Sequence, residues 1–124
     1  MNVTLHLHDE FKRQFRRLSK KYRSLIDDLE TFQKELQKNP LQGTDMGDGV
    51  RKIRMAIASK GKGKSGGARV LTLNVLVSDI GSQTEPNTTP SDGIDVTLLT
   101  IYDKNEIDNV SNEYIKWLVS EFKK

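Results

Sequence analysis

The sequence contains no cysteine, only three prolines, few aromatic residues and no long apolar run. The lack of cysteine excludes a disulfide scaffold, a zinc site made of thiolates and a thiol nucleophile. No apolar run approaches the roughly 18 residues of a membrane-spanning helix, and the N-terminal residues do not resemble a signal peptide. We therefore expect one soluble, cytoplasmic domain over residues 1–124, with no membrane partner and enough core to fold unaided.

Charge is unevenly distributed along the chain. Residues 1–70 carry 16 lysines and arginines against 8 acidic residues, whereas residues 71–124 carry 4 against 9. A basic half of this kind is typical of a surface that binds a polyanion, and the acidic half is typical of a solvated face. Charge alone does not distinguish RNA, DNA and an acidic protein as the partner.

The N-terminal part predicts a strand followed by two amphipathic helices. Apolar and polar residues alternate over residues 2–8, which indicates a half-buried strand at a sheet edge. Asp9 is expected to cap the first helix, Ser24 and Asp27 resemble a capping box for the second, and Pro40 ends it. The apolar stripes of the two helices consist of Phe11, Phe15, Leu18, Leu25, Leu29, Phe32 and Leu36.

Beyond Pro40 the pattern changes to turns and strands. Turn-forming residues fill positions 42–49, and strands are expected over residues 50–58, 68–77 and 96–102. Residues 78–93 include two prolines and several small polar residues, so we expect a mobile loop there.

A final helix is expected after residue 105, with Ser111 or Asn109 as its cap. Its lining residues are Val110, Tyr114, Trp117 or Leu118, and Phe122, for which core packing is the simplest interpretation. The predicted class is α+β, in the order β-α-α-β-β-β-α. We expect an antiparallel sheet with the helix hairpin on one face and the opposite face free for function.

Basic residues gather on the first two of the three later strands. Lys52 and Arg54 are two positions apart and share a face, while Ile53 and Met55 are expected to face the helices. Arg69 opens the next strand and would lie near this pair if the strands form a hairpin. Such a group suits phosphate binding, including stabilisation of a phosphorane-like transition state, although a basic strand face can also serve solubility alone.

The connection between these strands is rich in glycine and lysine, with Lys62 and Lys64 in the run GKGKSGG. Lys64-Ser65 resembles the end of a Walker A motif, but the first glycine of that motif is missing and a strand follows instead of a helix. A basic hairpin loop that grips a nucleic-acid backbone fits better, and a plain mobile loop is the alternative.

Other residue types give little sign of catalysis. His6 and His8 share a strand face, yet without a third ligand or a clustered carboxylate they are more simply surface residues than a metal site or a general base. No Ser-His-Asp pattern or metal-binding motif is visible, so we predict neither a metal nor a cofactor.

Three segments together resemble the RelE/ParE superfamily of toxins: residues 51–54 (RKIR), 61–70 (GKGKSGGARV) and 98–106 (LLTIYDKNE). The glycine-rich segment and the strand ending in IYDKNE are most similar to the HigB-2-like branch of RelE-type toxins. The resemblance spans nearly the whole chain, and the predicted order of elements matches the fold of that family, with a longer loop at residues 78–93.

The resemblance implies a toxin of a bacterial type II toxin–antitoxin system: a metal-independent endoribonuclease that enters the A site of the ribosome, cleaves mRNA there and is neutralised by a cognate antitoxin. By resemblance, Arg69 and Arg54 stabilise the phosphate, and Lys52 or Lys104 moves protons or positions the substrate. The basic first helix and the glycine-rich loop would bind RNA through Lys12, Arg13, Arg16, Arg17, Lys20, Lys62 and Lys64.

The chain departs from the family pattern at residues 107–110, where some members place a tyrosine. The general base therefore stays open, with Tyr102 or Tyr114 as substitutes only if the geometry allows. Two other functions stay open as well: a ParE-like toxin that inhibits DNA gyrase by binding, for which Arg69 and Lys52 would be dispensable, and an inactive RNA-binding module.

Overall fold

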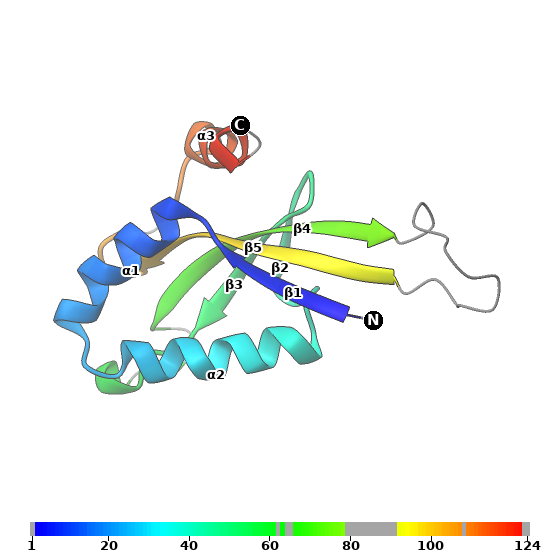
Figure 1. Cartoon of the computed structure of the whole chain (residues 1–124). Helices are drawn as coiled ribbons and strands as arrows, with labels where there is room; N and C mark the ends of the chain where they lie inside the picture. The colour runs from blue at the N-terminus through cyan, green and yellow to red at the C-terminus, as the bar shows by residue number, and fades with distance from the viewer. Residues whose placement is uncertain (1, 62, 64–65, 79–91, 108, 123–124) are drawn as a thin grey trace.

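A computed structural model describes residues 2–61, 63, 66–78, 92–107 and 109–122. Lys62, Lys64 and residues 79–91 of the predicted mobile loop lie outside them. The elements are, in chain order, β1 (Asn2–Leu7), α1 (Asp9–Lys21), α2 (Leu25–Lys38), β2 (Thr44–Gly47), β3 (Val50–Met55), the 3-10 helix η1 (Ala58–Lys60), β4 (Ala68–Ser78), β5 (Asp92–Asp103) and α3 (Asn112–Phe122) (Figure 1). The α+β class is confirmed, and Ser78, Asp92 and Gly93 belong to strands instead of the loop.

The five strands form one mixed sheet in the order β1-β5-β4-β3-β2. The expected antiparallel meander of β3, β4 and β5 is present, and β1 lies at an edge as predicted. The prediction of a purely antiparallel sheet was wrong, because β1 pairs with β5 in parallel. The helix hairpin between the first strand and the rest gives room for this crossover, which a tight turn cannot provide.

The extra strand β2 lies in the segment predicted as a turn. It pairs with β3 through a tight hairpin in which Asp48 and Gly49 have positive φ angles of 54° and 83°. All four residues of β2 are exposed. Its sequence therefore lacks the apolar alternation that reveals a half-buried strand.

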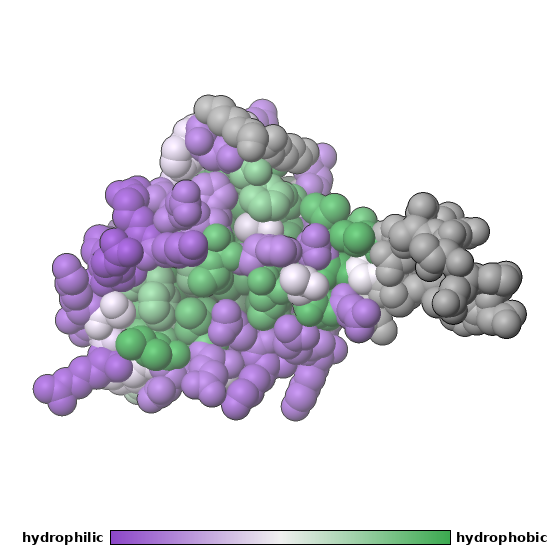
Figure 2. Space-filling view, in the orientation of Figure 1, coloured by the Kyte–Doolittle hydropathy of each residue, from purple (hydrophilic) through white to green (hydrophobic). Residues whose placement is uncertain are grey.

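One sheet face carries α1 and α2, as expected. Phe11, Leu18, Leu25, Phe32 and Leu36 from the helices are buried against sheet residues that include Ile53, Met55, Val70, Leu98 and Ile101. Figure 2 shows hydrophilic side chains along the outer sides of both helices and hydrophobic residues between them. Burial of each large apolar side chain contributes roughly 1.5–3 kcal/mol, so this layer supplies most of the core.

The opposite face is only partly free, which corrects the expectation of an open face. Helix α3 packs there through Leu118, against a second apolar cluster that includes Leu71, Leu99 and Tyr102. Trp117 is 46% exposed, so Leu118 and not Trp117 anchors this helix in the core. The part of the face that α3 leaves uncovered holds the basic residues of β3 and β4.

The helix caps differ from two of the three predictions. His8, not Asp9, caps α1, because its Nδ1 accepts a hydrogen bond of 2.9 Å from the Glu10 N–H. Ser24 precedes α2 without a side-chain cap bond, since its hydroxyl donates to Asp28 and accepts from the Ser59 N–H. Ser111 caps α3 as expected, accepting from the Tyr114 N–H. In the described part of the chain, no helix has both the length and the apolar character needed to span a bilayer.

Candidate phosphate-binding site

The four side chains predicted to be catalytic line one cavity of about 260 Å³. Its walls are formed by Thr44, Lys52, Arg54, Arg69, Lys104 and Asn109. Four of these six residues carry a positive charge, and no described residue of the wall is acidic. The cavity therefore has the electrostatics of an anion site.

Strand register explains why these residues meet. Arg54 lies directly opposite Arg69 in the β3–β4 ladder, which confirms the expected pairing, and Thr44 lies opposite Lys52 in the β2–β3 ladder. Lys52 and Arg54 share a face because successive side chains of a strand alternate. Lys104 directly follows β5, which lies beside β4. The site therefore draws on four neighbouring strands.

Two arginines side by side make this end of the sheet strongly positive. Arg69 is only 6% exposed, and its Nη1 donates to the carbonyl oxygen of Ala68 at 3.2 Å. Burial lowers the pKa of Arg69, and the neighbouring charge of Arg54 lowers it further. Like charges directly opposite in a sheet are destabilising. Bound phosphate oxygens would relieve this repulsion, and guanidinium groups suit them geometrically.

Two members of the wall were not predicted. The Lys52 Nζ donates to the Asn109 Oδ1 at 3.5 Å, which ties Asn109 to the basic strand. Thr44 belongs to the exposed strand β2. Nothing in the local sequence marks either residue as part of an anion site, because both reach the wall through pairing or packing with distant segments.

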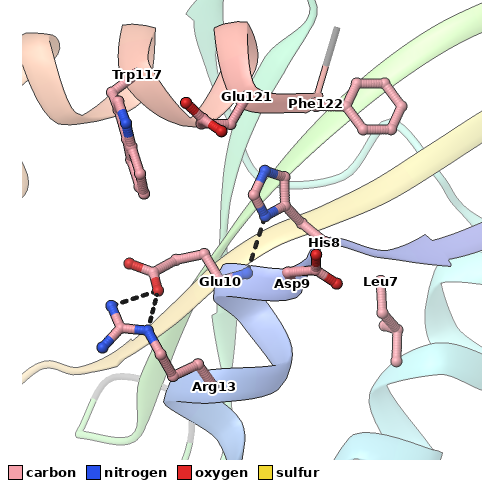
Figure 3. A pocket seen from close by; sticks show the side chains of 8 residues that line it. All are labelled: Leu7, His8, Asp9, Glu10, Arg13, Trp117, Glu121 and Phe122. Atoms are coloured by element: carbon pink, nitrogen blue, oxygen red, sulfur yellow. Dashed lines mark hydrogen bonds and ion pairs between the residues drawn. The ribbon is translucent and has the colours of Figure 1, made fainter. Parts of the chain in front are cut away.

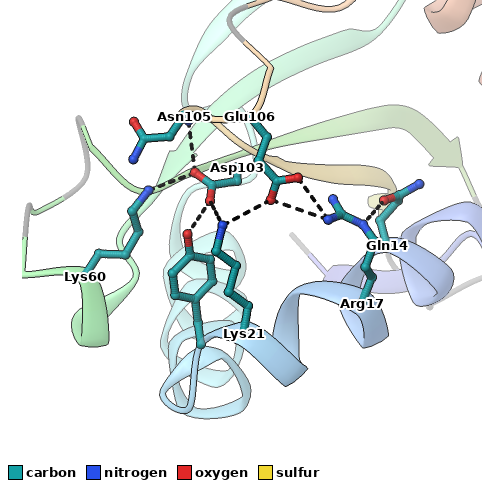
Figure 4. Close-up of polar contacts among 8 residues, drawn as sticks. Gln14, Arg17, Lys21, Lys60, Asp103, Asn105 and Glu106 are labelled. Carbon is teal, nitrogen blue, oxygen red and sulfur yellow. Dashed lines mark hydrogen bonds and ion pairs between the residues drawn. The ribbon is translucent and has the colours of Figure 1, made fainter.

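Behind the cavity, Asp103 forms a buried polar cluster (Figure 4). Its Oδ1 accepts from the Lys60 Nζ at 2.8 Å and from the Asn105 N–H at 3.0 Å, and its Oδ2 accepts from the Tyr22 hydroxyl. The Lys21 Nζ lies 3.9 Å from the Asp103 Oδ2. Burial opposes ionisation of Asp103, but the hydrogen bonds from Lys60, Tyr22 and Asn105 outweigh it, so the pKa of Asp103 is lowered.

The lowered pKa of Asp103 predicts a specific loss of stability in acid. A carboxyl whose pKa is depressed by folding stabilises the fold above its unfolded pKa of about 3.9, and that contribution disappears as pH falls through the folded value. We expect Asp103→Asn to lower the melting temperature at neutral pH, and the difference from wild type to shrink below about pH 4. Circular dichroism melts of both proteins across this range test it; a difference that stays constant or widens in acid would contradict the assignment.

The predicted RNA-binding residues of α1 divide into two groups. All five side chains are exposed. Arg13 donates to buried Glu10 of the same helix at 2.7 Å, and Arg17 donates to Gln14 at 3.1 Å and to Glu106, in the turn after β5, at 3.0 Å. Arg17 therefore ties α1 to that turn, whereas Lys12, Arg16 and Lys20 form the group available to a polyanion.

A second, larger cavity of about 450 Å³ lies between α1 and α3 (Figure 3). Its wall combines Leu7, His8, Asp9, Glu10, Arg13, Trp117, Glu121 and Phe122. Acidic and basic groups both contribute, and the Arg13–Glu10 pair neutralises part of the wall. This cavity is therefore less suited to phosphate than the basic cavity.

The tyrosines considered as general bases lie outside the basic cavity. Tyr114 donates to Glu10 Oε2 at 3.0 Å and lies within hydrogen-bonding distance of Thr100, at 3.1 Å. Burial raises the pKa of Tyr114, and Glu10 raises it further, so the phenolate form that could act as a general base is disfavoured. Tyr102 lies opposite Arg69 in the β4–β5 ladder, but it packs in the apolar cluster under α3 and is not one of the residues that line the cavity.

The histidines have structural surroundings. His8 caps α1, and His6 lies 3.6 Å from Asp95 at an exposed position. Among the described residues, no three His, Asp or Glu side chains gather closely enough to hold a metal ion.

Comparisons with known proteins do not assign a family to this chain. Neither the models of known protein families nor curated protein sequences match this chain.

Proposed function

We propose that this chain is the toxin of a bacterial type II toxin–antitoxin system and cleaves mRNA on the ribosome. The observation that carries the proposal is the convergence of Lys52, Arg54, Arg69 and Lys104 on one cavity. The resemblance to RelE-type toxins rests on the same residues, so the motif and the geometry support the same site. In this proposal the protein acts in the bacterial cytoplasm and a cognate antitoxin holds it inactive.

The proposed reaction is an intramolecular transfer within the RNA. The 2′-hydroxyl of one nucleotide loses its proton and attacks the adjacent phosphorus, forming an O2′–P bond. The P–O5′ bond breaks, and the leaving 5′-oxygen takes up a proton. The products are a 2′,3′-cyclic phosphate and a 5′-hydroxyl, and no oxidant or water is consumed.

The side chains of the cavity suit the charges that develop in this reaction. Negative charge grows on the non-bridging oxygens of the phosphorane, where Arg69 and Arg54 can each donate hydrogen bonds. The ammonium groups of Lys52 and Lys104 lie in the same wall. Because neither Tyr102 nor Tyr114 lines the cavity, we assign the proton transfers to these two lysines or to groups of the ribosome.

Ribosome binding is assigned to the exposed basic side of α1, made of Lys12, Arg16 and Lys20. Each phosphate contact releases counterions, so affinity for ribosomal RNA should fall steeply with salt. Such contacts orient the protein without reading sequence, and the cavity then acts on the mRNA that the ribosome presents.

Induced expression in a bacterial host tests the proposal, with wild type beside Arg69→Ala and the exposed Arg23→Ala as a matched control. We expect growth arrest with wild type and Arg23→Ala, and normal growth with Arg69→Ala at equal protein levels. Arrest that persists in Arg69→Ala with loss of DNA supercoiling would favour gyrase inhibition instead. Unaffected growth in all three strains would favour an inactive RNA-binding module.

A further inference from the structure

The turn that carries Lys104 is held from behind by the buried Asp103 cluster. Asp103 is fully buried and ends β5, whereas Lys104, the next residue, lines the basic cavity. Asp103 lies opposite Ala68 on the helix side of the sheet, so fixing its side chain there fixes the point at which the turn with Lys104 begins.

Backbone hydrogen bonds extend this restraint through the turn. The Lys104 N–H donates to the carbonyl oxygen of Gly67 at 3.2 Å, and the Glu106 N–H donates to the carbonyl oxygen of Asp103 at 3.0 Å. The Asn105 N–H donates to the Asp103 carboxylate. The position of Lys104 therefore depends on the end of the glycine-rich loop and on the Asp103 side chain together.

Side chains of α1 and η1 complete the restraint, as Figure 4 shows. The Glu106 carboxylate lies 3.0 Å from the Arg17 Nη1 and 3.7 Å from the Lys21 Nζ, and both of these residues belong to α1. Lys60 ends η1, its side chain is 6% exposed, and it forms an ion pair with Asp103 across 43 residues of sequence. Both acidic residues that flank Lys104 are thus bound on the side away from the cavity.

We infer that the buried Lys60–Asp103 ion pair positions Lys104 for anion binding in the basic cavity. A buried ion pair is often no more stabilising than apolar residues of the same size, so fixing geometry is the contribution that the pair is suited to make. Lys60 and Asp103 are positioning residues here. The consequence for RNA cleavage rests on the proposed function, whereas the consequence for anion binding does not.

A double-mutant cycle of Lys60→Met and Lys104→Ala tests the inference with two readouts: the affinity for inorganic phosphate, measured by NMR titration, and the turnover number for mRNA cleavage on ribosomes. Lys60→Met should weaken phosphate binding and slow cleavage by about tenfold in the wild-type background. In the Lys104→Ala background it should cause no further loss, since two residues that act through one contact are not additive.

Glu10→Gln is the matched control, because Glu10 is also a buried carboxylate paired with a basic residue but does not line the basic cavity. It should lower the melting temperature without changing either readout. Tyr22→Phe is a milder second probe, since it removes only the hydroxyl that donates to Asp103.

Losses from Lys60→Met that multiply with those of Lys104→Ala, or no loss at all from either probe of the cluster, would overturn the positioning role. Coupled phosphate binding without any mRNA cleavage would support the positioning role and contradict the proposed function. Cleavage that depends on Lys104 but not on Lys60 would support the proposed function and contradict the positioning role.

Discussion

Replacing Arg69 by methionine is expected to slow ribosome-dependent mRNA cleavage by about 10²–10³-fold, the usual cost of losing one preorganised donor to a developing negative charge. The melting temperature should stay unchanged or rise. Arg69 is buried opposite Arg54, and both burial and that charge lower its pKa, which means that the fold disfavours its charged form. Single-turnover cleavage assays and thermal melts measure the two effects.

Inorganic phosphate gives an independent measure of the same residue. Phosphate should raise the melting temperature of wild type more than that of Arg69→Met, because a ligand stabilises the state that binds it. Arg54→Gln, at an exposed position of the same wall, should also slow cleavage, with little effect on stability. A variant at position 69 that unfolds readily yet retains full cleavage would show that Arg69 is a structural residue.

Gly67→Ala is expected to destabilise the fold by about 3 kcal/mol, because an added methyl group has no space and overpacking is costly. A Cβ at this position would clash with the carbonyl oxygen of Met55 and lie 3.0 Å from the Ile57 nitrogen. Both are backbone atoms, which cannot move aside as a flexible side chain can. For a chain of this size the expected drop in melting temperature is about 10 °C.

Gly61→Ala provides the comparison within the same loop. Gly61 has a φ of 69°, but no atom lies within 4 Å of its added Cβ. Only the left-handed backbone conformation opposes alanine, at a cost of roughly 1–2 kcal/mol. Equal destabilisation by the two substitutions, measured by denaturant unfolding, would mean that close packing is not the reason for glycine at position 67.

Gly67 has a packing role in the structure, although its motif suggests phosphate binding. In the sequence, the run GKSGG suggests a loop that wraps a phosphate. In the structure, Gly67 instead allows β4 to begin against the residues that follow β3, and its carbonyl oxygen accepts the Lys104 N–H. This glycine therefore serves the site by packing, whatever the rest of the loop binds.

The alternation of residues in the strands made much of the site predictable. Lys52 and Arg54 had to share a face once Ile53 and Met55 were assigned to the core, and a hairpin placed Arg69 beside them. Helix periodicity likewise identified the buried stripe of the helix hairpin, including Phe11, Leu18, Leu25, Phe32 and Leu36. These patterns are local, so the sequence displays them directly.

The features that could not be predicted depend on contacts between distant segments. The parallel pairing of β1 with β5 leaves no trace in either strand, because alternation is the same in both directions. The Lys60–Asp103 pair joins η1 to the end of β5, and in the sequence each residue alone resembles an ordinary surface charge. The same holds for Asn109, which reaches the cavity only through the path of the chain before α3.

Cleavage of mRNA at the basic cavity is best tested by the chemistry of the cut ends when purified protein acts on mRNA bound to translating ribosomes. We predict cuts on the ribosome that leave a 2′,3′-cyclic phosphate and a 5′-hydroxyl, and loss of these cuts in Arg69→Met. Uncut mRNA in the presence of folded protein, or ends that carry a 3′-hydroxyl and a 5′-phosphate, would contradict it.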